Sequence, residues 1–228
     1  MGNAIDIERY LSKKDPHLGR TIKIVRAARG ERLRPPPSTD NAFQALVRAV
    51  IYQRSSEASG STVYSHLERI AGGKLAPAKV LSLTVGRIRR AGMSKAKATY
   101  VRNLGEWFDA NPKMAKRLAS MADDEIVSSL TTIKGIGLWT VNVLLVFNLG
   151  RLDVAPAPDA VIRGIARIVY GLKAQPSVEF FKEKMETWRP YRSIATMYLY
   201  QAGKLKLTPA DIRRGRAGAD EAGIRSGT

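Results

Sequence analysis

The chain has 228 residues, 44% of them hydrophobic, so it can fold as one compact unit or as two closely packed lobes around a sizeable core. Its 38 lysines and arginines against 20 aspartates and glutamates give a net charge of +18, which favours a polyanionic partner such as nucleic acid over a basic surface kept for solubility. The absence of cysteine excludes disulfides, thiolate metal sites, iron–sulfur clusters and a cysteine nucleophile, and the two histidines lie too far apart in the sequence to suggest a zinc site.

The first 34 residues are predicted to form helices that pack against a lobe built from the end of the chain. The opening MGNAIDIERYLSKKD is charged and lacks an apolar signal core, and the chain contains no run of about 18 apolar residues. We therefore expect no membrane partner and a cytoplasmic location, with association to the nucleoid through the nucleic acid.

Helical spacing dominates the rest of the chain. A proline-rich segment with capping residues at 35–40 precedes a helix at 41–53, whose apolar side chains recur at i, i+3, i+4, i+7 and i+8. No segment alternates as a strand does, so the expected class is all-α. Residues 204–228 are expected to form a flexible basic tail. Further helices are predicted at 61–70, 78–83, 94–108, 113–119, 123–130, 136–149, 160–170, 177–187 and 191–202.

The segment Lys134-Gly135-Ile136-Gly137 lies between two predicted helices. Its glycines allow a phosphate to approach main-chain amides, and the following helix presents its free N–H groups and dipole to such an anion. Lys134 adds a positive charge, and Thr140 can donate a hydrogen bond from the first helical turn. An ordinary link between helices with a glycine cap gives a similar pattern. With the basic excess, we favour a helix-hairpin-helix phosphate clamp.

A lone carboxylate, Asp159, follows the proline-stiffened loop 153–158 and heads the next helix. An aspartate at a helix N-cap is usually structural, and contributes about 1 kcal/mol to helix stability. An N-cap also holds a carboxylate rigid, so a structural and a catalytic role can coexist at Asp159. Asp153 is interpreted as a loop or capping residue.

Three segments together resemble the HhH-GPD superfamily of base excision DNA glycosylases. Residues 130–170 are similar to its helix-hairpin-helix, Gly/Pro-rich loop and catalytic aspartate. Residues 42–53 resemble the helix before its DNA-probing loop, and residues 188–193 (WRPYRS) resemble a motif of the alkylpurine, or 3-methyladenine DNA glycosylase II, branch. The similarity extends over about residues 16–203. It implies two helical lobes, lobe A at about 36–150 and lobe B from about 1–35 and 151–203, with the active-site cleft between them.

The resemblance makes Asp159 the catalytic carboxylate. A fixed anion stabilises the oxocarbenium-like transition state of N-glycosidic cleavage and can orient or deprotonate water. Trp139 stands where bifunctional members carry a Schiff-base lysine, so the implied reaction leaves an abasic site without strand cleavage. Trp139 and Tyr191 match the walls of an aromatic pocket for a flipped, cationic alkylpurine, with Trp188 as their support, although core packing also explains each of these residues. Related enzymes have tryptophan at the position of Tyr191, which leaves substrate breadth open.

The probing loop departs from the family pattern. Relatives carry a leucine that fills the gap left by the flipped base, whereas this chain has Gln53-Arg54-Ser55-Ser56. Arg54 is the expected wedge, because its guanidinium plane can stack; Ser55 or another loop is the alternative. Gln53 is assigned to the base pocket. Its alternative roles are contact with the base opposite the lesion and capping of a helix end.

The resemblance also implies the partner and the ions. We expect double-stranded damaged DNA, a monomer, no required cofactor, and a Na⁺ or K⁺ ion held by main-chain carbonyls of Thr131, Ile133 and Ile136. The favoured function is a monofunctional glycosylase for 3-methyladenine and 7-methylguanine lesions. Two alternatives are a glycosylase for uracil, hypoxanthine or an oxidised purine, and a non-catalytic module that binds damaged DNA.

Overall fold

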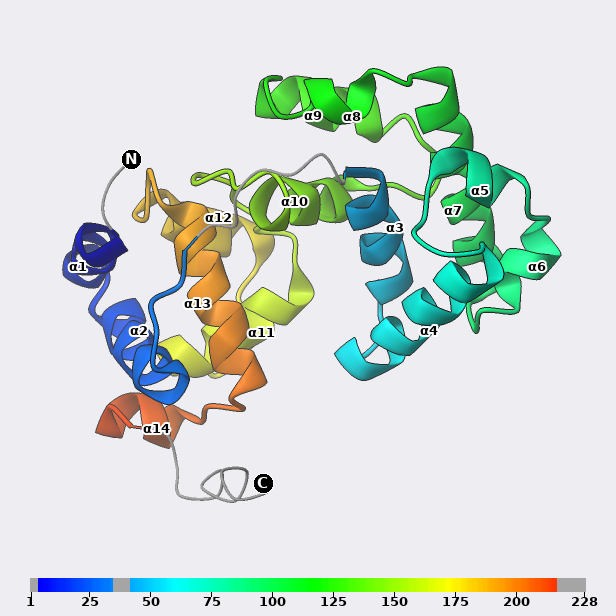
Figure 1. Cartoon of the computed structure of the whole chain (residues 1–228). Helices are drawn as coiled ribbons and strands as arrows, with labels where there is room; N and C mark the ends of the chain where they lie inside the picture. The colour runs from blue at the N-terminus through cyan, green and yellow to red at the C-terminus, as the bar shows by residue number, and fades with distance from the viewer. Residues whose placement is uncertain (1–3, 35–41, 217–228) are drawn as a thin grey trace. The chain divides into compact units, whose positions relative to one another are not determined.

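The computed structural model describes residues 4–34 and 42–216, and these residues contain helices and connecting loops without a strand (Figure 1). The all-α prediction is therefore confirmed for this part of the chain. The chain divides into two compact units: unit 1 is Met1–Pro35 with Arg151–Thr228, and unit 2 is Pro36–Gly150. The proline-rich segment predicted at 35–40 lies outside the described residues. Within the described ranges, every helix is too short or too polar to cross a membrane.

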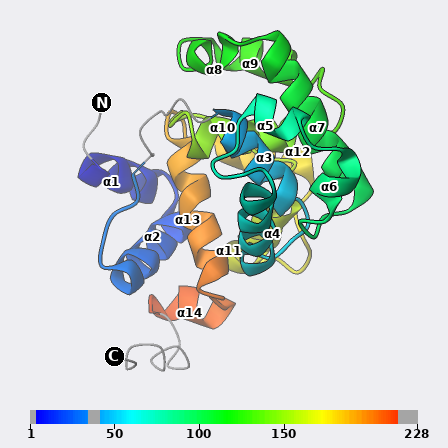
Figure 2. The same cartoon turned by 45° about the vertical axis from the view of Figure 1, so that its right-hand side comes forward.

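Unit 1 is built around α2 and α13. Helix α2 contacts α1, α11, α13 and α14, and α13 also contacts α11, an arrangement that can be followed in Figure 2. The N-terminal helices thus pack against the end of the chain, as predicted. The helices of unit 1 are α1 (Ala4–Lys14), α2 (Pro16–Arg29), α11 (Ala160–Tyr170), α12 (Val178–Glu186), α13 (Arg192–Lys204) and α14 (Pro209–Arg214).

A buried carboxylate joins three parts of unit 1. Asp15 caps α2 by accepting the backbone N–H groups of His17 and Leu18, each at 3.1 Å. Its other oxygen accepts the indole N–H of Trp188 at 3.0 Å and the Tyr170 hydroxyl at 2.6 Å, and pairs with Lys184 at 2.8 Å. Burial by itself raises the pKa of Asp15, but the hydrogen bonds from Lys184, Tyr170 and Trp188 together hold this pKa below its usual value.

Residues 204–216 differ from the predicted flexible tail. Helix α13 continues to Lys204, and α14 follows at Pro209–Arg214. Thr208 and Asp211 form a capping box, with the Asp211 carboxylate accepting the Thr208 N–H at 2.8 Å, while Leu207 and Ile212 are buried. The cap and the two apolar anchors explain the order that composition alone did not predict. Residues 217–228 lie outside the described part.

Unit 2 is built around α7, which contacts α3, α5 and α6. Helix α3 also packs against α4 and α10, so one helix supports both the segment after Tyr52 and the segment before Leu138. The bounds of α9 agree with the sequence prediction, whereas the short helix α6 was not predicted. The helices of unit 2 are α3 (Ala42–Tyr52), α4 (Glu57–Ile70), α5 (Pro77–Leu81), α6 (Val85–Arg89), α7 (Lys95–Ala110), α8 (Met114–Arg117), α9 (Asp123–Leu130) and α10 (Leu138–Phe147).

Candidate functional site

The hairpin between α9 and α10 forms around Gly135. This glycine has a φ of +99°, and a Cβ added to it would stand 2.1 Å from Cγ of Tyr100. Gly137 is the N-cap of α10 and makes no side-chain cap, and Lys134 beside the turn is exposed. Backbone N–H groups at an uncapped helix start, next to a lysine, suit a phosphate.

Thr140 does not lie where the sequence suggested. We predicted that its hydroxyl donates to phosphate, but the residue is only 1% exposed. Its Oγ1 accepts a hydrogen bond from Nε2 of Gln53 at 3.0 Å, and the same nitrogen lies 3.5 Å from the carbonyl oxygen of Gly135. Helix α10 is apolar on nearly every face, so its sequence does not reveal which side is buried. Thr140 and Gln53 therefore tie the probing loop to the hairpin.

The probing loop is a short turn between α3 and α4. Arg54 is exposed and has a φ of +54°, the left-handed region that favours glycine. Ser55 donates its N–H to the carbonyl of Tyr52 at 3.1 Å, and Ser56 caps α4. The ammonium group of Lys97 donates to the carbonyl of Ile51 at 2.6 Å and to Oγ of Ser55 at 3.0 Å. Lys97 was missed from the sequence, because its partners are more than 40 residues away.

Asp159 is both the N-cap of α11 and a buried, fully oriented carboxylate. It is 4% exposed, and Oδ1 accepts the N–H groups of Val161 at 2.8 Å and Ile162 at 3.1 Å. Oδ2 accepts the hydroxyl of Tyr200, which comes from α13. The helix dipole and these three hydrogen-bond donors thus stabilise the negative charge of the Asp159 carboxylate. Tyr200 was not predicted, because an aromatic side chain on a helix gives no sign that its hydroxyl binds a carboxylate.

The WRPYRS motif holds the loop that leads to Asp159. Arg192 donates to both carboxylate oxygens of Asp153, at 2.7 and 3.0 Å, and to the Asp153 carbonyl at 2.7 Å. Arg189 adds a second ion pair to Asp153 at 2.9 Å. Ser193 accepts the N–H of Val154 at 3.0 Å. Asp153 is therefore a loop residue held by two arginines, and the motif positions the backbone before the carboxylate.

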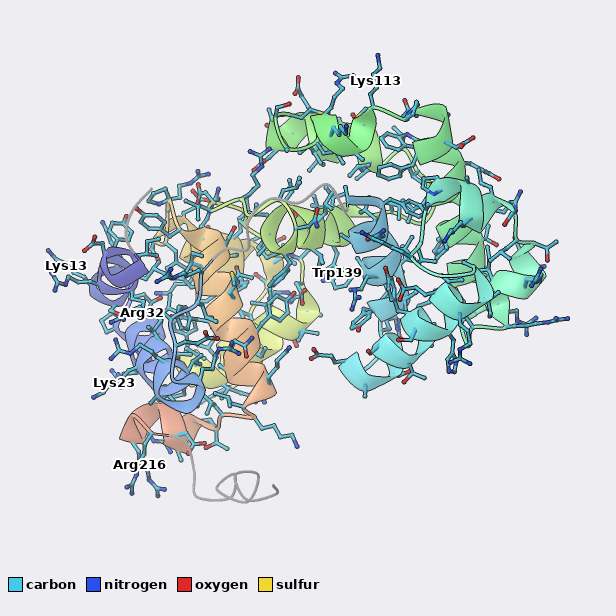
Figure 3. All side chains as sticks on the ribbon, in the orientation of Figure 1. Lys13, Lys23, Arg32, Lys113, Trp139 and Arg216 are labelled. Atoms are coloured by element: carbon cyan, nitrogen blue, oxygen red, sulfur yellow. The ribbon has the colours of Figure 1, made fainter. Side chains whose placement is uncertain are left out.

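The aromatic candidates occupy different environments. Trp139 is half-buried in the first turn of α10, where Figure 3 labels it, and belongs to unit 2. Tyr191 is half-buried in unit 1 and makes an edge-to-face contact with Tyr10, with ring centroids 5.5 Å apart. Trp188 is 0% exposed and is a core residue. Trp139 and Tyr191 are thus the two partly exposed rings among these candidates.

The hairpin carbonyls have the donor chemistry for a monovalent cation. The Ile133 carbonyl accepts the Ile136 N–H at 2.9 Å within the turn, which uses one of its two lone pairs. The Thr131 and Ile136 carbonyls belong to the same turn and supply neutral oxygens. Among the described residues, no group of three or more His, Cys, Asp or Glu side chains could hold a metal ion.

Comparisons with known proteins give a consistent set of similarities. Residues 47–190 match a family described as "HhH-GPD superfamily base excision DNA repair protein". The chain is 26% identical to "Alkylbase DNA glycosidase-like protein mag2" of Schizosaccharomyces pombe over 87% of this chain and 93% of that protein. It is 29% identical to "DNA-3-methyladenine glycosylase 1" of the same organism over 87% of each. The fold is similar to that of 3-methyladenine DNA glycosylase (Mag1) from S. pombe in complex with abasic DNA, with a TM-score of 0.78 and 27% identity, covering 87% of this chain and 97% of that one.

Proposed function

This chain belongs to the HhH-GPD superfamily of base excision DNA repair proteins, and from that premise we propose that it is a monofunctional DNA glycosylase for alkylated purines. The resemblance stated from the sequence motifs is thereby confirmed. The enzyme flips a 3-methyladenine or 7-methylguanine type base out of the stack, hydrolyses its N-glycosidic bond and leaves an abasic site. The relatives named as alkylbase and 3-methyladenine glycosylases support this substrate class, because the match covers 87% or more of each.

The geometry of Asp159 carries the proposal. Cleavage of an N-glycosidic bond develops positive charge on the sugar, and a preorganised anion in a buried position stabilises that charge. Asp159 is 4% exposed and held by two backbone N–H groups and the Tyr200 hydroxyl. Both oxygens are thus oriented before substrate arrives. Such a carboxylate acts mainly as a fixed anion, and it can also orient the attacking water.

The absence of an amine at position 139 limits the reaction to hydrolysis. A Schiff base with the sugar requires a lysine amine, and Trp139 carries none. Lys134 lies in the hairpin turn, where its exposed ammonium group is suited to phosphate. We assign Trp139 and Tyr191 to recognition of the base, because the face of an aromatic ring attracts a cationic alkylated base by about 0.5–2 kcal/mol.

DNA is the partner of this protein. We propose further that the DNA is a damaged duplex, that the protein binds it as a monomer, and that it does so in the cytoplasm. The hairpin provides phosphate contacts through the backbone from Gly135 to Gly137 and through Lys134. Arg54 enters the base stack, with Ser55 beside it. A Na⁺ or K⁺ ion at the carbonyls of Thr131, Ile133 and Ile136 would add positive charge at the phosphate.

A panel of lesion duplexes tests the proposal. Purified protein and its Asp159→Asn variant are incubated with duplexes that carry 7-methylguanine, 3-methyladenine, hypoxanthine, uracil or 8-oxoguanine. Asparagine also caps helices well, so this variant should fold. We expect release of the two methylated purines, strand breaks only after alkali, and a loss of at least about 100-fold in the variant, the scale of removing one preorganised electrostatic group.

Other outcomes of the panel point elsewhere. Release of uracil, hypoxanthine or 8-oxoguanine alone would move the substrate class to another lesion. Undiminished release by the Asp159 variant, or breaks without alkali, would overturn the mechanism. Tight binding to an abasic duplex without any base release would leave a damaged-DNA-binding module.

A further inference from the structure

One face of α7 contacts both loops that the proposed function places on DNA. Lys97, Tyr100 and Asn103 follow one another at i, i+3 and i+6, so they lie on the same side of the helix. Asn103 donates to the carbonyl of Lys134 at 3.0 Å, and the Tyr100 ring lies against Gly135. Lys97 contacts the probing loop. A single helix therefore sets the positions of hairpin and probing loop.

Lys97 supplies a donor that the helix itself cannot supply. In a continuing helix, the carbonyl of Ile51 would accept the N–H of Ser55. Here the Ser55 N–H bonds to the carbonyl of Tyr52 instead, because α3 ends and the chain turns. The Lys97 ammonium group donates to the Ile51 carbonyl at 2.6 Å and so satisfies it.

The two contacts of Lys97 lie on either side of Arg54. Ile51 precedes this arginine and Ser55 follows it, and Lys97 binds both. Arg54 has a φ of +54°, and a left-handed conformation costs a residue with a side chain roughly 1–2 kcal/mol. A turn of this kind persists when neighbouring contacts hold it. The Lys97 contacts close the turn from both ends and leave the Arg54 side chain exposed.

Burial gives these contacts further weight. Desolvation lowers the pKa of the Lys97 ammonium group, in contrast to a lysine that extends into solvent. A charged donor that is partly removed from water makes hydrogen bonds stronger than those between neutral groups.

We propose that Lys97 is a positioning residue that holds the Arg54 turn ready to enter the base stack. The inference rests on the proposed glycosylase function and adds to it the group that keeps the wedge in place. Lys97 acts through the Ile51 carbonyl and the Ser55 hydroxyl of the turn, so its removal should impair unstacking of the base more than contact with DNA phosphates.

The test compares Lys97→Met with Lys79→Met. Lys79 also donates to a carbonyl near a helix end, that of Gly72 at 2.9 Å, so both variants lose one charge and one lysine–carbonyl bond. Base unstacking is followed by the fluorescence of 2-aminopurine placed next to 7-methylguanine, and base release is measured in single turnover. We expect Lys97→Met to lose roughly 10-fold or more in both, the scale of a hydrogen bond from a charged donor, and Lys79→Met to match the wild type.

Two further variants separate positioning from general stability. Lys97→Arg keeps a charged donor and should recover most of the fluorescence change. Ser55→Ala alone should reduce unstacking relative to the wild type. The double variant Lys97→Met/Ser55→Ala should unstack the base about as much as Lys97→Met does, because the two residues share one contact. If Lys97→Met fails to fold, as judged by circular dichroism and thermal unfolding, Ser55→Ala in the otherwise wild-type protein carries the test alone, and unstacking equal to that of the wild type then overturns the proposal. Equal unstacking by the wild type and Lys97→Met, or full additivity with Ser55→Ala, overturns the proposal.

The fluorescence arm also keeps this inference distinct from the proposed function. A duplex with 2-aminopurine beside an abasic site reports insertion of the wedge without any base release. Loss of the signal in Lys97→Met would support positioning even if no lesion were cleaved, whereas no signal with the wild type would overturn it. Failure of base release on every lesion would contradict the glycosylase activity alone.

Discussion

At the scale of single residues, Tyr200 distinguishes a bare helix cap from a carboxylate prepared for chemistry. A cap requires only the two N–H bonds to Oδ1 of Asp159, and the Tyr200 hydroxyl binds the other oxygen. The second contact costs side-chain entropy and adds little to capping. Its consequence is a carboxylate with a fixed plane.

We expect Tyr200→Phe to reduce the single-turnover rate of base release about tenfold with little change in DNA affinity, because one orienting hydrogen bond is lost. The measurement pairs rapid-quench kinetics with anisotropy binding to the same duplex. Tyr10→Phe is the matched control, since it loses a hydroxyl that donates to the Arg189 carbonyl in the same unit. An equal rate loss in both variants would indicate general loosening of unit 1 and contradict an orienting role.

Asp15 gives a stability prediction with a defined pH dependence. Because its pKa is lower in the folded chain than in the unfolded chain, the stabilisation is present above about pH 4 and is lost as pH falls through the folded-state pKa. Asp15→Asn keeps the helix cap but removes the negative charge that pairs with Lys184. This variant should lower the free energy of unfolding by about 3 kcal/mol at pH 7. Urea unfolding from pH 7 down to pH 3 measures the difference. A gap between wild type and variant that stays constant below pH 4 would contradict this account.

At the scale of elements, the loop before Asp159 is held by α13, which comes later in the chain than α11, the helix that directly follows the loop. Arg192 begins α13, its side chain is 11% exposed, and it makes three bonds to Asp153. Arg189 binds the same carboxylate with a side chain that is 54% exposed. Exposed pairs contribute little to stability, so Arg192 should dominate.

Arg192→Lys tests that ranking. Lysine keeps the charge but cannot reproduce the planar fork, so we expect a loss of about 1–2 kcal/mol in stability and a lower rate of base release. Arg189→Lys should change both by less. Thermal unfolding and single-turnover kinetics on the two variants provide the comparison. A larger effect at Arg189 would show that the loop is held differently.

The elements also show how far sequence reasoning reached. Helices α9 and α11 were predicted with their observed bounds, because α9 has an acidic first turn and α11 has Asp159 as N-cap and Gly171 after its end. Helices α6 and α14 were not predicted, and five or six residues are few for a helical period; α5, which is also five residues long, is predicted at 78–83 and observed at Pro77–Leu81. The hairpin glycine was predicted from local spacing. The groups that hold it, on α7, could not be, since such contacts join residues distant in the sequence.

At the scale of the whole molecule, charge governs how the protein approaches DNA. The net charge of +18 is spread over both units: Lys134 lies at the hairpin in unit 2, and Lys13, Lys23 and Arg216 extend outward from unit 1 (Figure 3). A field of this size accelerates encounters with DNA at low salt but does not by itself place a lesion in a site. The response of DNA binding to salt separates the general electrostatic attraction from a specific contact between the hairpin and a phosphate.

Binding to an undamaged duplex should weaken about 10³-fold or more between 50 and 200 mM salt, as counterions compete for the phosphates. If the hairpin contacts a phosphate through Lys134, Lys134→Gln should reduce the slope of log K against log salt by about 0.9. Lys173→Gln removes the same charge from an exposed position in unit 1 and should leave the slope nearly unchanged. Anisotropy titrations at four salt concentrations measure both. Equal small shifts would mean that Lys134 acts only through the general field, and the hairpin clamp would then depend on its backbone N–H groups alone.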